Sequence, residues 1–287
     1  HNGYIKRTSL STYRSQRRGG RGVQGASSRE EDFVEHLFVA NTHSYILFFT
    51  DRGKCYWVKV YDIPEGGRAA KGRAIVNLIG CDPEEKVSAF ISVKEFNEDH
   101  FVVMATEKGM VKKTKLSAYS NPRKKGIYAV EIREGDRLIE ARVSTGDNDI
   151  LLGTRNGKSI RFSEEQIRAS GRKTMGVKGI TLSSEDDKLV GMLLIKRDGT
   201  VLVATEKGFG KRTEISQYRA QKRGGKGVLT MKTTDKVGKM VTIKEVVEKD
   251  DLMIITNQGV LIRLPVSQIR SIAVSYTDLT LPTILLV

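Results

Sequence analysis

The sequence predicts an all-β fold, a propeller-like disc of six blades with three or four short strands in each. A unit of about fifty residues recurs six times along the 287 residues, and each unit has a glycine turn between two β-rich runs. No segment carries a long helical pattern. A single small sheet leaves apolar surface and strand edges open, and neighbouring blades packed around an axis cover both. An open row of blades is the alternative arrangement.

Each unit is centred on a predicted hairpin, and we number the units by their turn glycines. These glycines are separated by 50, 56, 48, 51 and 51 residues, and they are Gly3, Gly53, Gly109, Gly157, Gly208 and Gly259. Apolar runs such as ILFFT and VVMAT precede the turns, where glycine supplies the positive φ of a tight hairpin. The strand after each turn alternates charged and apolar residues, as one solvated face requires. We expect one domain over residues 1–274, with blades starting near residues 1, 45, 101, 149, 200 and 251.

Further elements follow each hairpin. A third strand is expected in each blade, for example over Leu189–Ile195. Helical signals are weak, and the best of them, Glu164–Ala169 and Ile243–Glu248, are too short for a stable helix.

Both ends of the sequence look clipped, which leaves open whether the first and sixth units join to close a ring. Residues 275–287, SYTDLTLPTILLV, contain no Lys, Arg or Gly and break both the period and the charge pattern. We expect these residues to be a vector-encoded tail, with a divergent native end as the alternative.

The composition favours an anionic partner. The formal net charge is +15, which suits nucleic acid or an anionic membrane surface. No apolar run reaches transmembrane length, so nucleic acid is the better assignment, and a soluble basic protein without such a partner is the alternative. Cys55 and Cys81 stand far apart without a C-x-x-C pattern and read as two reduced thiols of a cytosolic protein. The four histidines form no ligand pattern, so we expect no metal and no cofactor.

A second glycine follows each of the first five turn glycines by 19, 19, 17, 19 and 19 residues, and the loop before it is always basic. Two loops carry nearly the same run, QRRGGRG and QKRGGKG, which comprise Gln16, Arg17, Arg18, Gly19, Gly20, Arg21 and Gly22, and Gln221, Lys222, Arg223, Gly224, Gly225, Lys226 and Gly227. The other loops contribute Arg68, Lys71, Arg123, Lys124, Lys125, Arg172 and Lys173. A solvated turn explains any single loop, but five basic loops in register predict one continuous basic rim.

We expect the strand after each turn to add positive charge to this rim. Its candidate residues are Lys6, Arg7, Lys112, Lys113, Arg161, Lys211 and Arg212. Glycines let the backbone approach phosphates closely, and arginine adds bidentate contacts. No recognition helix is apparent, so the pattern predicts sequence-tolerant bending of a duplex around the rim. Tyr13, Tyr119 and Tyr218 recur beside the basic loops and are expected to pack within the blades.

One apparent nucleotide-binding motif lacks the structural context that such a site requires. Residues 20–25, GRGVQG, fit G-x-G-x-x-G but lack the preceding strand and following helix that a dinucleotide site requires. There is no Walker motif, acid–base pair or nucleophile elbow, and an enzyme with its site in a central channel has no candidate residues. A propeller-type scaffold for protein interactions remains an alternative.

The run QRRGGRG resembles the signature Q-[RK]-R-G-G-[RK]-G of the C-terminal domain of bacterial DNA gyrase A. The repeated pattern T-x-x-G-x-x-K-[RK]-[TS] extends the resemblance from Asn2 to about Ile272. The resemblance implies a β-pinwheel, in which four-stranded blades exchange strands with their neighbours. It also implies the wrapping of duplex DNA in support of negative supercoiling.

The same resemblance implies partners and absences. The partners are double-stranded DNA, the catalytic N-terminal part of gyrase A, and gyrase B, in the bacterial cytoplasm. The catalytic tyrosine and the ATPase lie outside this stretch, so the chain is expected to bind and bend DNA without cutting it. The related C-terminal domain of topoisomerase IV is the nearest alternative. That domain usually has a degraded box, so two intact boxes favour gyrase.

Overall fold

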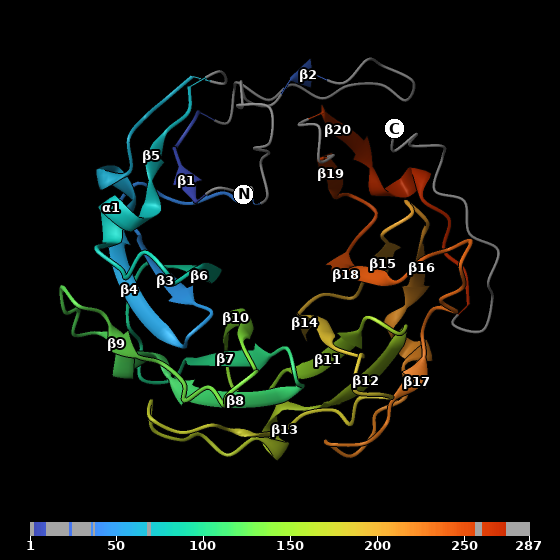
Figure 1. Cartoon of the computed structure of the whole chain (residues 1–287). Coiled ribbons are helices and arrows are strands. Elements are labelled where there is room, and N and C mark those ends of the chain that lie inside the picture. Colours follow the sequence, from blue (N-terminus) through green and yellow to red (C-terminus); the bar gives the residue numbers. More distant parts are fainter. Residues whose placement is uncertain are drawn as a thin grey trace.

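The computed structural model of the chain describes residues 3–9, 23–24, 36, 38–67, 70–255 and 260–273. Antiparallel sheets of two to four strands follow one another around a common axis (Figure 1). This arrangement confirms the predicted all-β, propeller-like fold class.

Five of these sheets are built on hairpins. The hairpin strands are β3 (Tyr45–Thr50) and β4 (Lys54–Lys59), β7 (Phe101–Thr106) and β8 (Met110–Lys115), β11 (Asp149–Thr154) and β12 (Lys158–Ser163), β15 (Thr200–Thr205) and β16 (Gly210–Glu214), and β19 (Asp251–Ile255) and β20 (Val260–Pro265). The predicted positive φ is present at Gly157, at 82°, and a Cβ there would lie 1.9 Å from the carbonyl oxygen of Met231. Gly259 lies outside the described residues.

A third strand pairs with the first hairpin strand on the side nearer the axis (Figure 1). These inner strands are β6 (Val87–Val93), β10 (Leu138–Ser144), β14 (Leu189–Ile195) and β18 (Met240–Val246). The strand predicted over Leu189–Ile195 is therefore confirmed. The weak helical signal over Ile243–Glu248, expected to be too short for a stable helix, forms none, because residues 243–246 belong to β18 and pair with β15.

The outermost strand of each described four-stranded sheet comes from the next unit along the chain. β9 (Ile127–Tyr128) pairs with β4, β13 (Val177–Lys178) pairs with β8, and β17 (Val228–Leu229) pairs with β12. β5 (Arg73–Ala74) of the second unit pairs with β1 (Tyr4–Ile5) of the first. This is the strand exchange that a pinwheel implies.

The first and sixth units are joined by the same exchange. β2 (Val23–Gln24) belongs to the first unit and pairs with β20 of the sixth. The ring that the sequence leaves open is closed by this pairing.

Short helical turns follow the outer hairpin strands. They are η2 (Val60–Asp62), η3 (Leu116–Tyr119), η4 (Glu164–Gln166), η5 (Ile215–Gln217) and η6 (Val266–Gln268), all 3₁₀. The helical signal at Glu164–Ala169 is thus a single turn, η4. One α-helix, α1 (Ile75–Ile79), was not predicted, and it lies in the longest interval between turn glycines.

The apolar core lies between neighbouring sheets. One cluster joins Leu47 and Phe49 of β3 with Val102 and Met104 of β7. Tyr119 and Tyr218 are buried in such clusters, as predicted, whereas Tyr13 lies outside the described residues. Each blade therefore depends on its neighbours to bury its faces.

Candidate nucleic-acid interface

In the third to fifth units, the second glycine and its basic loop lie on the outer edge of the disc. We call residues 121–126, 170–176 and 221–227 the corner loops of the third, fourth and fifth units. They lead directly into β9, β13 and β17, which occupy the circumference in Figure 1. The first box, Gln16–Gly22, and Arg68 lie outside the described residues.

The second glycine is required by close packing. Gly227 has φ 71°, and a Cβ there would lie 2.5 Å from the carbonyl oxygen of Ser159. Gly176 has φ 82° and would place a Cβ 2.3 Å from the carbonyl oxygen of Val111. The repeat of this glycine therefore marks the point where each corner passes over the preceding hairpin.

Backbone hydrogen bonds connect consecutive corners. The amide of Thr181 donates to the carbonyl of Gly225 (2.9 Å), and the amide of Gly224 donates to that of Gly179 (2.8 Å). One unit earlier, the amide of Glu131 donates to Thr174 in the same way (3.1 Å). The corners of the third to fifth units thus form one continuous edge.

Two arginines of the corners hold this edge together. Arg223 Nη1 donates to the carbonyl of Lys178 (2.5 Å), and its Nε donates to that of Gln166 (3.2 Å). Arg172 Nη1 donates to the carbonyl of Tyr128 (3.4 Å). Both arginines stand four residues before the second glycine. The sequence suggested only a DNA contact for them, whereas the structure gives them a bracing role.

The hairpin-strand cations are not on the rim. Lys112, Lys113, Lys211 and Arg212 are 1%, 7%, 1% and 4% exposed, so the expectation that they line an open basic surface was wrong. The sequence assigned one face of this strand to solvent, but the next unit covers that face.

In the first, third and fifth units, a lysine stands three residues after the turn glycine, and carbonyl groups surround its ammonium group. Lys112 Nζ donates to the carbonyls of Ala129 and Arg172, both at 2.6 Å. Lys6 Nζ donates to Ala70 (2.7 Å), and Lys211 Nζ donates to Ala273 (3.2 Å). Burial lowers the pKa of Lys112 to about 7, with repulsion from Arg172 as a further cause. Burial likewise lowers the pKa of Lys211 to about 8 and lowers that of Lys6.

The residue four positions after the turn glycine joins its unit to the helical turn of the following one. The sequence did not predict this contact. The side chain there donates to a carbonyl at or beside the 3₁₀ turn of the following unit: Arg7 to Ile63 (2.9 Å), Trp57 to Tyr119 (2.8 Å), Lys113 to Glu164 (3.4 Å), Arg161 to Ile215 (3.1 Å) and Arg212 to Ile269 (2.7 Å). Arg161 also pairs with Asp149 at 2.6 Å. Arg7 and Arg161 are therefore structural donors, which corrects their assignment to the rim. The sequence does contain a signal for this bond, because a side chain with a hydrogen-bond donor stands four residues after each turn glycine.

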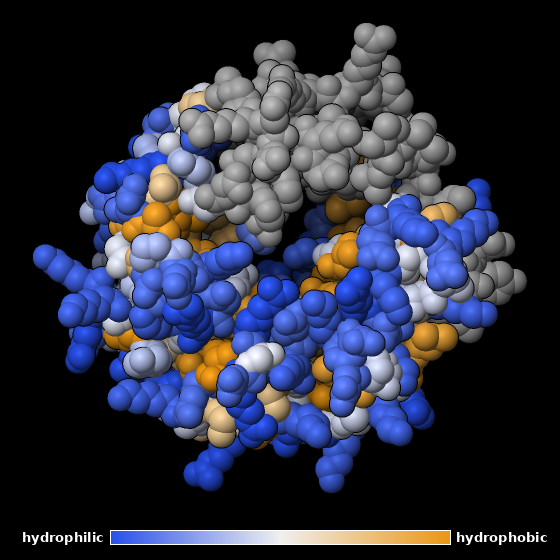
Figure 2. Space-filling view, in the orientation of Figure 1, coloured by the Kyte–Doolittle hydropathy of each residue, from blue (hydrophilic) through white to orange (hydrophobic). Residues whose placement is uncertain are grey.

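The remaining corner cations project to solvent. Arg123, Lys124, Lys125, Lys173, Lys222 and Lys226 are exposed. Within the described residues, no carboxylate lies within ion-pair distance of any of them. Figure 2 shows hydrophilic side chains along the circumference, projecting furthest beside β9. Lys71 is also exposed, and its Nζ lies 4.2 Å from the centre of the Tyr4 ring. Arg73 and Lys178 are exposed on the same edge and were missed because they follow the second glycine.

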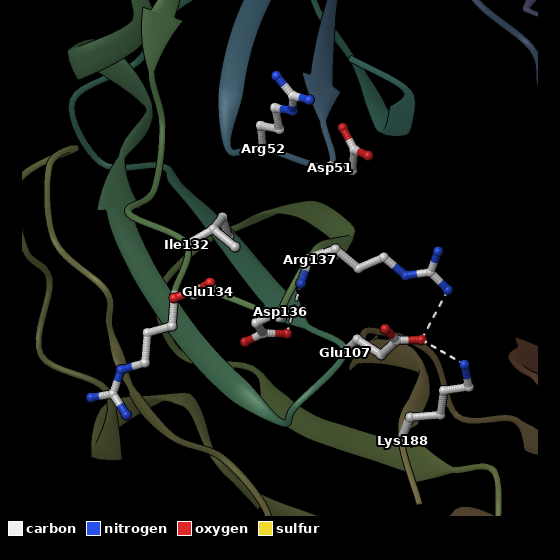
Figure 3. Close-up of a pocket in the computed structure, with 10 residues that line it drawn as sticks. Asp51, Arg52, Glu107, Ile132, Glu134, Asp136, Arg137 and Lys188 are labelled. Carbon is white, nitrogen blue, oxygen red and sulfur yellow. Dashed lines mark hydrogen bonds and ion pairs between the residues drawn. The ribbon is translucent and has the colours of Figure 1, made fainter. Parts of the chain in front are cut away.

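Cations beside the hairpin turns are arranged differently. They surround a cavity of about 690 Å³ between the turns of the second and third units (Figure 3). Arg137 and Lys188 both turn toward Glu107, at 2.9 Å each, and Arg52 pairs with Glu84 at 2.8 Å. Arg52, Arg137 and Lys188 are therefore neutralised by carboxylates, whereas the exposed corner cations named above have no carboxylate partner within the described residues.

Within the described residues, no group of three or more His, Cys, Asp or Glu could hold a metal ion. The helices of this part are all too short or too polar to cross a membrane. Cys55 and Cys81 are buried free thiols, and burial raises the pKa of both.

A closed disc of strand-exchanging blades with a basic circumference defines a propeller-like class of protein. The family model described as "DNA gyrase C-terminal domain, beta-propeller" matches residues 1–41, 44–94, 100–145, 148–196, 199–246 and 250–273. The chain belongs to this family.

Curated relatives agree with the family. The DNA gyrase A protein of Clostridium acetobutylicum is 49% identical over 281 residues, which are 98% of this chain and 34% of that protein. The DNA gyrase A protein of Staphylococcus aureus is 47% identical over 272 residues, 94% of this chain and 31% of that protein. The chain therefore spans about a third of the length of these relatives.

Solved structures share the fold. A structure of a DNA gyrase A C-terminal domain superposes with a TM-score of 0.80 at 24% identity, covering 91% of this chain and 86% of that one. A C-terminal domain of DNA topoisomerase IV superposes with a TM-score of 0.77 at 26% identity, covering 98% and 86%.

Proposed function

We propose that this chain binds duplex DNA along its circumference, without reading base sequence, and bends it around the disc. The observation that carries the proposal is the row of unpaired cations at consecutive corners. Lysine and arginine side chains attract phosphates and release condensed counterions, whatever the base sequence. Within the described residues, no helix of groove-reading length projects from the circumference, which favours contact with the DNA backbone.

The energy of bending is compatible with this proposal. Curving a site of 20–30 bp smoothly costs about 1–6 kcal/mol. Each neutralised phosphate steepens the fall of log affinity with log salt by about 0.9. Contacts at several corners along a curved edge offset the bend, because the curvature brings more phosphates within reach.

Within a longer protein, we propose that the chain supports negative supercoiling by DNA gyrase, a type II topoisomerase. Its partners there are the catalytic N-terminal part of gyrase A and the gyrase B protein. The support is the match of the gyrase family model along the chain and the 47–49% identity to gyrase A sequences. Bond cleavage and ATP hydrolysis are assigned to those other parts.

The test is a salt series of binding to a linear duplex of mixed sequence. We expect log affinity to fall linearly with log salt, and the variant Lys173→Gln/Lys222→Gln/Lys226→Gln to show a slope shallower by about 2.7, from about 0.9 per contact. Equal slopes for the two proteins would remove the corners from the interface. A scaffold for protein interactions would show no salt-dependent DNA affinity.

A further inference from the structure

One arginine recurs at a fixed distance after three of the turn glycines. Arg168, Arg219 and Arg270 each stand 11 residues after a turn glycine, namely Gly157, Gly208 and Gly259. All three are exposed, and none makes a side-chain hydrogen bond or ion pair within the described residues. They differ in this from Arg172 and Arg223, whose guanidinium groups are engaged by carbonyls.

The backbone of each arginine is fixed on both sides. The preceding residue is buried in each case, as Ile167, Tyr218 and Ile269. The following residue forms a bridge to the outer hairpin strand of the previous unit: Ala169 to Lys113, Ala220 to Arg161 and Ser271 to Arg212. A side chain on such a fixed backbone loses only its own rotamer freedom on binding.

These arginines share the circumference with the corners. Ala169 bridges to Lys113, and β13 pairs with Val111 of the same strand. One unit later, Ala220 bridges to Arg161, and β17 pairs with Ser159. Two residues of a strand span about 7 Å, so Arg168 and Arg219 each lie beside a corner on one edge of the disc. The bridge of Ser271 to Arg212 places Arg270 at the equivalent position of the next unit.

We propose that Arg168, Arg219 and Arg270 form a row of phosphate contacts, one at each of three consecutive blade junctions. This inference rests on the proposed binding of duplex DNA and adds to it contacts that the corner lysines do not supply. A guanidinium group binds a phosphate through two parallel hydrogen bonds. Because these three groups have no internal partner within the described residues, contact with DNA breaks no bond there.

The experiment replaces the three arginines together, as Arg168→Gln/Arg219→Gln/Arg270→Gln, in the 287-residue chain. Binding to a linear duplex of mixed sequence is measured across a salt series. We expect the slope of log affinity against log salt to be shallower by about 2.7, at about 0.9 per phosphate. The thermal midpoint should not change, since no contact among the described residues is lost.

Two further variants sharpen the result. Arg168→Lys/Arg219→Lys/Arg270→Lys keeps the charge and should keep the wild-type slope. Lys86→Gln/Lys236→Gln/Lys249→Gln removes the same charge from exposed lysines beside the inner strands and should leave the slope unchanged. If the triple glutamine variant loses stability, the three single variants are measured instead. Each should make the slope of log affinity against log salt shallower by about 0.9.

The outcomes separate the two proposals. A wild-type slope in the glutamine variants would overturn this row of contacts and leave DNA binding through the corners in place. An equal decrease in the control variant would also overturn it, because charge alone would then explain the effect. Absence of salt-dependent binding by the wild-type chain would contradict the proposed function itself.

Discussion

The position of a single residue decides whether its charge is exposed at the surface or buried within the fold. Lys112 and Lys124 are both basic residues of the third unit, yet Lys112 is caged by two carbonyls and Lys124 is exposed. The cage accepts the ammonium hydrogens, while burial disfavours the charged form. The ionisation of the caged lysine is therefore coupled to folding.

Replacing Lys112 with methionine should change how stability depends on pH. The pKa of Lys112 is about 7 in the folded chain, below its ordinary value of 10.5. Between those values the unfolded chain binds more protons, so wild-type stability rises with pH there. From pH 7 to pH 9 we expect the wild type to gain roughly 2 kcal/mol more than Lys112→Met, at about 1.4 kcal/mol per pKa unit. Urea unfolding at the two pH values measures this, with Lys124→Met as the control, and parallel pH profiles for wild type and Lys112→Met would contradict it.

The second glycine of a corner should not tolerate a side chain. Gly227→Ala forces an alanine into positive φ against the carbonyl of Ser159, so we expect a loss of about 1–3 kcal/mol in unfolding free energy. Gly171→Ala is the matched control, because it lies in a corner with nothing within 4 Å of an added Cβ. Thermal and urea unfolding compare the two, and equal stability would show that the close approach does not matter.

At the scale of elements, neighbouring units are held by side chains that donate to backbone carbonyls across each junction. The donor is arginine or lysine at four junctions and Trp57 at another, so the bond itself is what recurs, whichever residue supplies it. Such a bond leaves a buried carbonyl unsatisfied when its donor is lost. Hydrogen bonds at several junctions therefore contribute to the stability of the disc.

Trp57→Phe removes one of these donors with little change in apolar volume. The carbonyl of Tyr119 loses its partner, and we expect a loss of about 1–3 kcal/mol in unfolding free energy. Equilibrium urea denaturation of the two proteins measures it. A variant as stable as the wild type would show that the indole N–H does not hold this junction.

Arg223→Ala should loosen the fifth corner while leaving the blades folded. Its guanidinium holds the carbonyls of Lys178 and Gln166, so its loss should speed hydrogen exchange at the amides of Gly224 and Thr181. Lys222→Ala is the control, since Lys222 is exposed in the same corner. Similar exchange rates in both variants would argue against the brace.

Some of these elements are predictable from the sequence, and others are not. The hairpins and the third strand at Leu189–Ile195 follow from local patterns repeated along the chain. Outer strands such as Ile127–Tyr128 are two residues long, too short to show a pattern, and their exchange was implied by family resemblance alone. The face of Lys112 was misassigned because its covering carbonyl, that of Arg172, comes from 60 residues away.

At the scale of the whole molecule, charge is separated by position on a closed ring. The pairing of β2 with β20 joins the first unit to the sixth, so the corner edge is carried on a single disc. Carboxylates neutralise Arg137 and Lys188 beside the turns, whereas exposed corner cations such as Lys124, Lys173 and Lys222 have no carboxylate partner within the described residues. A disc of this kind offers a polyanion one curved path, along its circumference.

The most direct measurement of this path is ligation of a nicked plasmid in the presence of increasing amounts of the chain. Wrapping of the duplex around the disc with one handedness predicts that the linking number of the sealed product shifts in proportion to the chain bound. At equal occupancy, the variant Lys173→Gln/Lys222→Gln/Lys226→Gln should give a smaller shift. An unchanged distribution of topoisomers at saturating occupancy by the wild-type chain would contradict the account.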